Sequence, residues 1–311
     1  MMNRKAFIRN SLIAGTAAIA GPGVLGAKAS GTDSNRQDTH TFNLNYAPHF
    51  GMFRHHAGND PIDQLKFMAE AGFTAFEDNG MMGRSTQMQN KIGDTLARLD
   101  MKMGVFVIDK GGNSANSLAA GKQEYVDIFL DGCRRAVDVA RRVNAKWMTV
   151  VPGDFQRHLP IGIQTANVIE ALRRGAEILE PHGLVMVLEP LSDTPDLFLR
   201  TSDQTYMICK AVDSPSCKIL FDIYHLQKNE GHLIRNMDLC WEEIAYFQIG
   251  DNPGRNEPGT GEINYRNVFK FIHDKGYEGI MGMEHGNALP GKQGEQALIK
   301  AYVEADSFKV G

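Results

Sequence analysis

The sequence predicts a single (β/α)8 TIM barrel, and three observations favour that fold. Short apolar segments alternate with longer amphipathic segments from residue 41 to the end of the chain. Several of the apolar segments close on one polar residue, as buried parallel strands do where their carboxyl ends open into a site. The chain has 311 residues, and a barrel of this class uses about 250 residues as one domain. A doubly wound open sheet is the alternative, but no G-x-G-x-x-G motif follows the first apolar segment.

Residues 1–29 differ in composition from the rest of the chain and are typical of an export signal. Arg4, Lys5 and Arg9 precede an uncharged stretch of small and apolar residues, and Ala27-Lys28-Ala29 offers a cleavage site. The basic segment resembles a twin-arginine motif in which Lys5 replaces the second arginine. We therefore predict a cleaved, twin-arginine-like signal and a periplasmic protein without a stable membrane anchor. A Sec signal and an uncleaved anchor are the alternatives.

The charge and the cysteines of the chain exclude several classes of partner. Residues 30–40 are predicted to be a linker and residues 41–311 the barrel. The formal net charge is −4; loss of residues 1–29 removes four basic and no acidic residues, which leaves 29 basic against 37 acidic residues and a net charge of −8. A chain this acidic has no basic surface for nucleic acid. Its 4 cysteines lack the CxxC spacing of a zinc or redox site. The predicted partner is a small molecule, and the sequence leaves assembly into a homo-oligomer open.

Strands and helices are predicted to alternate along the barrel. Apolar segments of strand length lie at residues 42–47, 73–77, 102–108, 146–151, 184–189, 218–222, 245–248 and 279–284. Segments of helical periodicity lie at residues 61–71, 85–100, 123–143, 163–181, 202–212, 231–238, 264–275 and 292–308. The first helix has a clear start, because Asp60 is a good N-cap and Pro61 suits the first helical position. This alternation is that of a (β/α)8 barrel.

Four of the later predicted strands close on a side chain that carries an oxygen. The four residues, in the segments LVMVLEP, KILFDIYH, AYFQIGD and GIMGMEHG, are Glu189, Asp222, Gln248 and Glu284. Because the carboxyl ends of barrel strands open onto one face, we expect these side chains to converge. Carboxylate and amide oxygens are typical ligands of Mg²⁺ or Mn²⁺. The alternative is that each residue caps a strand or pairs with a neighbouring cation.

The segments around these residues resemble the hydroxypyruvate isomerase family, part of the xylose-isomerase-like barrel superfamily. The matching pieces are Leu188-Glu189, FDIYHLQKNEG at residues 221–231, QIGDNPGRNEPGTGEINY at residues 248–265, and Gly282-Met283-Glu284. RNEP followed by GEINY is specific to the family, whereas LEP and DIYH recur across the superfamily. The resemblance covers about a third of the chain at motif level.

The resemblance implies a metal-dependent isomerase of the aldose-ketose type, an intramolecular oxidoreductase of carbohydrate metabolism. The implied metal ligands are the four residues at the strand ends, Glu189, Asp222, Gln248 and Glu284. Glu189 and Glu284 would also be the catalytic acid and base. His225 would bind substrate oxygens, and Arg255 would bind an anion or a hydroxyl group of the substrate. Related ketose 3-epimerases generally have a histidine where Gln248 stands, which favours the isomerase branch.

The chemistry that these residues can support leaves alternatives open. Moving a carbonyl between adjacent carbons requires removal of a neighbouring proton, and the enediolate that results carries negative charge on two oxygens. A divalent ion that binds both oxygens would stabilise this charge, and a carboxylate would carry the proton. The same parts support epimerisation, so a ketose 3-epimerase is an alternative, as is a periplasmic sugar-binding protein without turnover. The export signal and His285-Gly286 depart from the isomerases of this family and leave the substrate open.

Overall fold

The computed structural model describes residues 40–310, which fall within one compact unit. The export signal predicted for residues 1–29 lies outside the described residues, as does the predicted linker up to residue 39. The barrel predicted from residue 41 is therefore the part whose architecture can be compared with the sequence.

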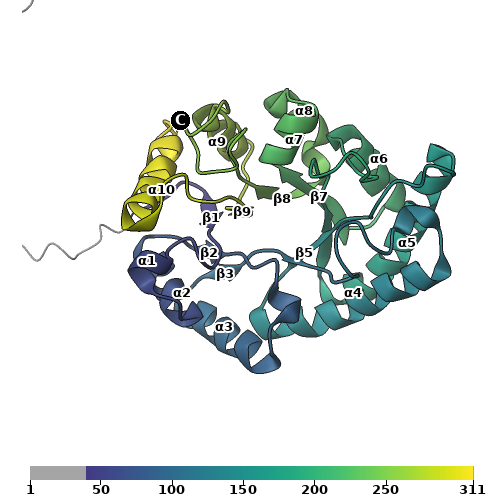
Figure 1. Cartoon of the computed structure of the whole chain (residues 1–311), viewed down its shortest axis with the longest axis horizontal. Helices are drawn as coiled ribbons and strands as arrows, with labels where there is room; N and C mark the ends of the chain where they lie inside the picture. Colours follow the sequence, from purple (N-terminus) through teal and green to yellow (C-terminus); the bar gives the residue numbers. More distant parts are fainter. Residues whose placement is uncertain (1–39, 311) are drawn as a thin grey trace, which may run out of the picture. The chain divides into compact units, whose positions relative to one another are not determined.

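Parallel strands line the inside of the described unit (Figure 1). One sheet has the order β1-β9-β8-β7-β6-β5-β4, and β2 pairs with β3 in a second sheet. The strands are β1 (Asn45–Ala47), β2 (Ala75–Phe76), β3 (Lys102–Met103), β4 (Phe106–Val107), β5 (Trp147–Val150), β6 (Val185–Leu188), β7 (Cys217–Asp222), β8 (Ile244–Gln248) and β9 (Ile280–Gly282). Every predicted strand is found at its expected place, and the order along the sheet follows the order along the chain. The fold is therefore a TIM-barrel-like α/β fold.

The third predicted strand, residues 102–108, is divided into β3 and β4. Gly104 lies at the interruption, where a Cβ atom would come within 2.4 Å of the Tyr246 hydroxyl oxygen. β3 pairs with β2 and β4 pairs with β5, so the divided strand joins the two sheets. A parallel bridge between His49 and Glu77 links the carboxyl end of β1 to that of β2. Neighbouring strands are thus in contact around the ring.

Helices cover the outer side of the strands (Figure 1). They are α1 (Arg54–Ala57), α2 (Pro61–Glu70), α3 (Thr86–Arg98), α4 (Gln123–Val143), α5 (Ile161–Leu179), α6 (Ser202–Val212), α7 (Ile223–Asn229), α8 (Leu233–Cys240), α9 (Tyr265–Asp274) and α10 (Gly291–Asp306). Each predicted helix begins and ends within two residues of its expected bounds. The sequence did not predict α1 or α7, and α7 turns out to carry part of the site. No helix among residues 40–310 is both long and apolar enough to span a membrane.

The hydrophobic core has two layers. Inside the ring of strands lies a cluster of mostly small side chains, Ala47, Ala75, Val105, Val185, Val187, Leu220, Tyr246 and Ile280. A larger cluster fills the space between strands and helices and includes Phe106, Phe129 and Met148. Cys133, one of four buried free cysteines in the described chain, lies in this outer layer. The filled interior leaves the carboxyl ends of the strands as the place where polar side chains can gather.

Asp306 at the end of α10 ties the last helix to the first strand, and its removal should cost stability. Its carboxylate accepts hydrogen bonds from the Tyr46 hydroxyl at 2.7 Å and from the Asn43 backbone N–H at 2.6 Å. We expect Asp306→Ala to lower the free energy of unfolding by about 2–4 kcal/mol, because the buried Tyr46 hydroxyl and the partly buried Asn43 backbone N–H both lose their acceptor. Urea unfolding measures the change. Asp274→Ala, which removes an exposed partner of Lys270, is the matched control and should cost under about 1 kcal/mol. Equal losses in both variants would contradict the assigned role of Asp306.

Candidate active site

The four strand-end residues lie at the carboxyl edge of neighbouring strands. Glu189 follows β6, Asp222 ends β7, Gln248 ends β8, and Glu284 follows β9 by two residues. In the strand register Asp222 is paired with Gln248, and Gln248 with Gly282. The expectation that parallel strands deliver these side chains to one edge therefore agrees with the register.

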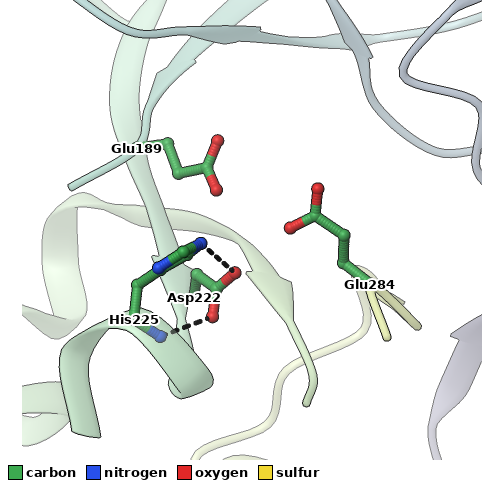
Figure 2. Close-up of side chains that lie close together, drawn as sticks. All are labelled: Glu189, Asp222, His225 and Glu284. Carbon is green, nitrogen blue, oxygen red and sulfur yellow. Dashed lines mark hydrogen bonds and ion pairs between the residues drawn. The ribbon is translucent and has the colours of Figure 1, made fainter. Parts of the chain in front are cut away.

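Three carboxylates and one imidazole converge at this edge (Figure 2). Glu189, Asp222, His225 and Glu284 each offer one donor atom, and these atoms all lie within 4.8 Å of one another. Figure 2 shows the carboxylates of Glu189 and Glu284 pointing toward each other, with Asp222 and His225 close beside them. So dense a group of carboxylates is unfavourable unless a cation lies among them.

The electrostatics of the site reflect this crowding. Burial, together with the negative charges of Glu284 and Asp222, raises the pKa of Glu189 well above its ordinary value. Burial and the charge of Asp222 likewise raise the pKa of Glu284. The guanidinium of Arg255 opposes both shifts. Carboxylates with raised pKa values are stronger bases than exposed ones, which suits groups that take up a proton.

The side-chain amide of Gln248 has a hydrogen-bond partner at its nitrogen but, within the described residues, none at its oxygen. Its side chain is fully buried, and its Nε2 donates a hydrogen bond to Glu77 Oε1 at 2.9 Å. Its carbonyl oxygen Oε1 is buried and has no hydrogen-bond partner among the described residues. A buried acceptor without a partner costs free energy unless a ligand satisfies it. This oxygen is therefore a candidate ligand atom beside Asp222.

Asp222 is at once the last residue of β7 and the N-cap of α7. Its Oδ1 accepts a hydrogen bond from the His225 backbone N–H at 3.0 Å, which satisfies a free donor of the first helical turn. His225 lies in α7, a helix that was not expected from the sequence. The N-cap explains the difference, because it starts a helix directly at the strand end.

The hydrogen bonds of His225 indicate whether its ring is suited to donate to a substrate oxygen or to bind a metal ion. Its Nδ1 lies 3.1 Å from the Ser192 backbone nitrogen and 2.7 Å from the Ser192 hydroxyl oxygen. Since a backbone N–H only donates, Nδ1 is an acceptor, and the proton of the neutral ring is then on Nε2. Burial lowers the pKa of His225, which favours the neutral ring. Nε2 lies 3.7 Å from Asp222 Oδ2 and has no hydrogen-bond partner in the described chain. A protonated Nε2 suits a donor to a substrate oxygen and not a metal ligand.

Arg255 reaches the site from the loop at residues 251–263. It donates from Nη2 to Glu284 Oε2 at 2.8 Å and lies 3.8 Å from Asp222 Oδ2, with its guanidinium over the Tyr224 ring. Asp251 builds the loop: its carboxylate accepts hydrogen bonds from four backbone N–H groups, those of Asn252, Gly259, Gly261 and Ile263. The predicted position of Arg255 at the site agrees with this geometry. Asp251 had no predicted role, although its place three residues after the end of β8 was a signal.

Asn79 is a site residue that the sequence analysis missed. Its Nδ2 donates to Glu284 Oε1 at 2.8 Å, so both oxygens of Glu284 are held, one by Asn79 and one by Arg255. Asn79 also lines a cavity of about 280 Å³ with Val107, Lys110 and Val151. Asn79 therefore connects this cavity to the carboxylate cluster, since it contacts both the cavity and Glu284. The position of Asn79 just after β2 was the only sequence signal for it.

The donor set fits a hard divalent cation. Glu189, Asp222 and Glu284 supply carboxylates, and the unpartnered carbonyl oxygen of Gln248 completes a set of oxygen donors. The cluster has more negative charge than Arg255 alone can balance, and a divalent ion would supply the remainder. Zinc generally prefers histidine or cysteine ligands, whereas the His225 proton faces the site.

Comparison with known proteins identifies the family. The profile of the xylose isomerase-like TIM barrel family matches residues 65–302. The chain belongs to this family. This assignment confirms the resemblance predicted from the strand-end motifs.

Named relatives of this xylose isomerase-like barrel include isomerases. Hydroxypyruvate isomerase of Escherichia coli (strain K12) is 35% identical over 163 residues, which cover 50% of this chain and 62% of that protein. The 2-oxo-tetronate isomerase of Cupriavidus necator is 34% identical over 122 residues, or 39% of this chain and 47% of that protein. The chain thus spans less than two thirds of the length of these relatives. The solved structure of 3-keto-D-glucoside 4-epimerase, YcjR, from E. coli has a TM-score of 0.69 at 17% identity, covers 85% of this chain and 100% of that one, and shows the shared fold.

Proposed function

We propose that this protein is a metal-dependent isomerase of a small hydroxy-keto acid or sugar, similar to hydroxypyruvate isomerase. One observation carries the proposal: three carboxylates from three strand ends gather within 4.8 Å beside an unpartnered amide oxygen. The names of the relatives, hydroxypyruvate isomerase and 2-oxo-tetronate isomerase, favour the same class of reaction.

The residues that would hold the ion are Glu189, Asp222, Gln248 and Glu284. Mg²⁺ or Mn²⁺ matches these oxygen donors. When bound, such an ion would supply positive charge that stabilises the negative oxygens developing on the substrate.

Glu189 and Glu284 would transfer the proton between adjacent substrate carbons. Their carboxylates face each other, so a substrate between them offers one face to each (Figure 2). Glu284 is fixed by Asn79 and Arg255. By contrast, no hydrogen bond to the Glu189 carboxylate is found within residues 40–310, which leaves its oxygens available to the substrate. One glutamate would remove the proton from the first carbon. The same glutamate or the other one would then return the proton to the neighbouring carbon, which completes the isomerisation.

His225 and Arg255 would bind and orient the substrate. The Nε2–H of His225 is a free donor beside Asp222. The Arg255 side chain is 31% exposed and carries further N–H donors beyond the one that Glu284 accepts. Both groups are placed to donate to oxygens that gain negative charge, and such fixed donors lower the barrier of an enolisation.

Turnover in D₂O tests this function directly. Hydroxypyruvate, 2-oxo-tetronate and free ketoses should each be incubated with the Mn²⁺-loaded protein, and the products examined by NMR. We expect at least one of them to give a product whose carbonyl has moved to the neighbouring carbon. Deuterium from solvent should appear at the carbon that receives the proton. A product with the carbonyl in place and one carbinol inverted would instead identify an epimerase. Saturable binding with no deuterium uptake would identify a binding protein.

We further propose export to the periplasm, on the sequence of residues 1–29 alone. Cell fractionation followed by N-terminal sequencing tests this proposal, and a mature chain that begins at Ser30 would agree with it.

A further inference from the structure

The orientation of the Gln248 amide decides whether the site gains a ligand oxygen or loses one. The two ends of a carboxamide have nearly the same shape but opposite hydrogen-bonding character. With Oε1 toward Asp222 and its neighbours the amide presents a lone pair to a cation. If Nε2 faced Asp222 instead, the amide would present its N–H hydrogens, which repel a cation. Some group on the far side of the amide must select the first orientation.

Glu77 is that group. It lies at the carboxyl end of β2, is 1% exposed, and accepts the Gln248 Nε2–H at Oε1 over 2.9 Å. Both carboxylate oxygens of Glu77 accept hydrogen bonds, Oε1 from Gln248 and Oε2 from the Tyr246 hydroxyl, so the reversed amide would place its carbonyl oxygen against another acceptor, Glu77 Oε1. The observed orientation avoids that repulsion and leaves Gln248 Oε1 without a partner on the other side.

Glu77 is itself held in place by the interior of the barrel. Its second oxygen, Oε2, accepts the Tyr246 hydroxyl at 2.8 Å, and that hydroxyl in turn lies 3.4 Å from the Val105 backbone N–H. The chain of hydrogen bonds runs from the backbone between β3 and β4 through Tyr246 and Glu77 to Gln248. Each member is buried, so none can exchange its partner for solvent.

Two glycines make room for this chain of hydrogen bonds. A Cβ atom on Gly282 would lie 1.8 Å from Glu77 Oε2, and a Cβ atom on Gly104 would lie 2.4 Å from the Tyr246 hydroxyl oxygen. Any larger residue at either position would displace the network. The space around Glu77 and Tyr246 is therefore shaped by Gly282 of β9 and by Gly104 between β3 and β4.

We propose that Glu77 is a positioning residue for the ion site, which fixes the Gln248 amide with its carbonyl oxygen toward the ion. This inference rests on the proposed function and deepens it. It adds Glu77, which follows β2 and is far in sequence from the proposed ligands, to the residues that determine how tightly a divalent cation binds.

The test is Mn²⁺ binding to the full chain, measured by calorimetry without substrate. Glu77→Met removes the acceptor and keeps the volume, and we expect about 10- to 100-fold weaker Mn²⁺ binding, the usual range for a group that orients a ligand. Gln248→Met removes the ligand itself. In the double variant Glu77→Met/Gln248→Met the loss should equal that of Gln248→Met alone, because Glu77 acts only through Gln248.

Glu295→Met is the matched control for loss of a buried carboxylate. Glu295 is fully buried and accepts hydrogen bonds from the backbone N–H groups of His55 and His56, away from Gln248. This variant should lose stability and bind Mn²⁺ within about threefold of the unchanged protein. If Glu77→Met does not fold, Glu77→Gln takes its place with an expected loss of at least threefold.

The outcomes separate the inference from the function on which it rests. Unchanged Mn²⁺ affinity in the Glu77 variant, or losses that multiply in the double variant, would overturn the positioning role while leaving the isomerase proposal standing. An unchanged protein that binds no Mn²⁺ would overturn the metal-dependent function, and the positioning role with it.

Discussion

Glu284→Gln is expected to lower turnover by about 10²- to 10⁴-fold, the contribution typical of a positioned acid or base. The amide keeps the shape of the side chain and can still accept the hydrogen bond from Asn79, but it cannot take up a proton. It also weakens the contact with Arg255, which now pairs with a full charge at 2.8 Å. Steady-state kinetics on the substrate identified in D₂O measures the loss.

The stability of the same variant distinguishes lost chemistry from lost fold. Glu189, Asp222 and Glu284 repel one another, so neutralising one of them should leave the metal-free protein as stable as before, or more stable. Glu257→Gln is the control: Glu257 is buried in the neighbouring loop and accepts the Ala288 backbone N–H at 2.8 Å, but has no assigned role in proton transfer. Its turnover should stay within about threefold. Full activity in Glu284→Gln would refute the assigned role of Glu284.

Removal of divalent cations is expected to abolish turnover completely and reversibly. Without an ion the substrate oxygens gain charge beside three carboxylates, and Arg255 is the one cationic side chain within salt-bridge distance of Glu284 in the described chain. Dialysis against a chelator followed by kinetics measures the loss. Addition of Mn²⁺ or Mg²⁺ should restore activity, since both prefer oxygen donors.

Thermal melting of the same samples provides a readout independent of substrate. An ion present at 100 times its dissociation constant stabilises the folded state by about 2.7 kcal/mol, so Mn²⁺ should raise the melting temperature. The Gln248→Met variant should show a smaller rise at the same concentration. A melting temperature that does not change when Mn²⁺ is added, together with turnover retained after chelation, would contradict a metal-dependent site.

The strand ends were predictable because a buried strand has an apolar local composition. Runs such as those ending at Glu189 and Asp222 are apolar throughout and then turn polar at one position, which locates both the strand and its exit from the core. The parallel order of a barrel then predicts convergence without any knowledge of side-chain geometry. The helix bounds followed in the same way from periodicity and capping residues.

The rest of the site depends on contacts between segments distant in sequence. Asn79 and Glu77 lie about 170 to 200 positions before their partners Glu284 and Gln248, and a single sequence carries no mark of such a pair. α7 escaped prediction because seven residues are too short for a clear helical period. The interruption between β3 and β4 was not predicted because it depends on a contact distant in sequence. Gly104 is needed there to make room for the Tyr246 hydroxyl.

The double role of Asp222 limits how this site can be redesigned. The same carboxylate that belongs to the ligand cluster also begins a helix by accepting the His225 backbone N–H. A substitution there disturbs the helix start as well as the cluster, so a drop in activity cannot be assigned to coordination alone. An engineer who wished to graft this chemistry onto another barrel would need to transplant the strand and the first turn of α7 as one piece, with His225 included.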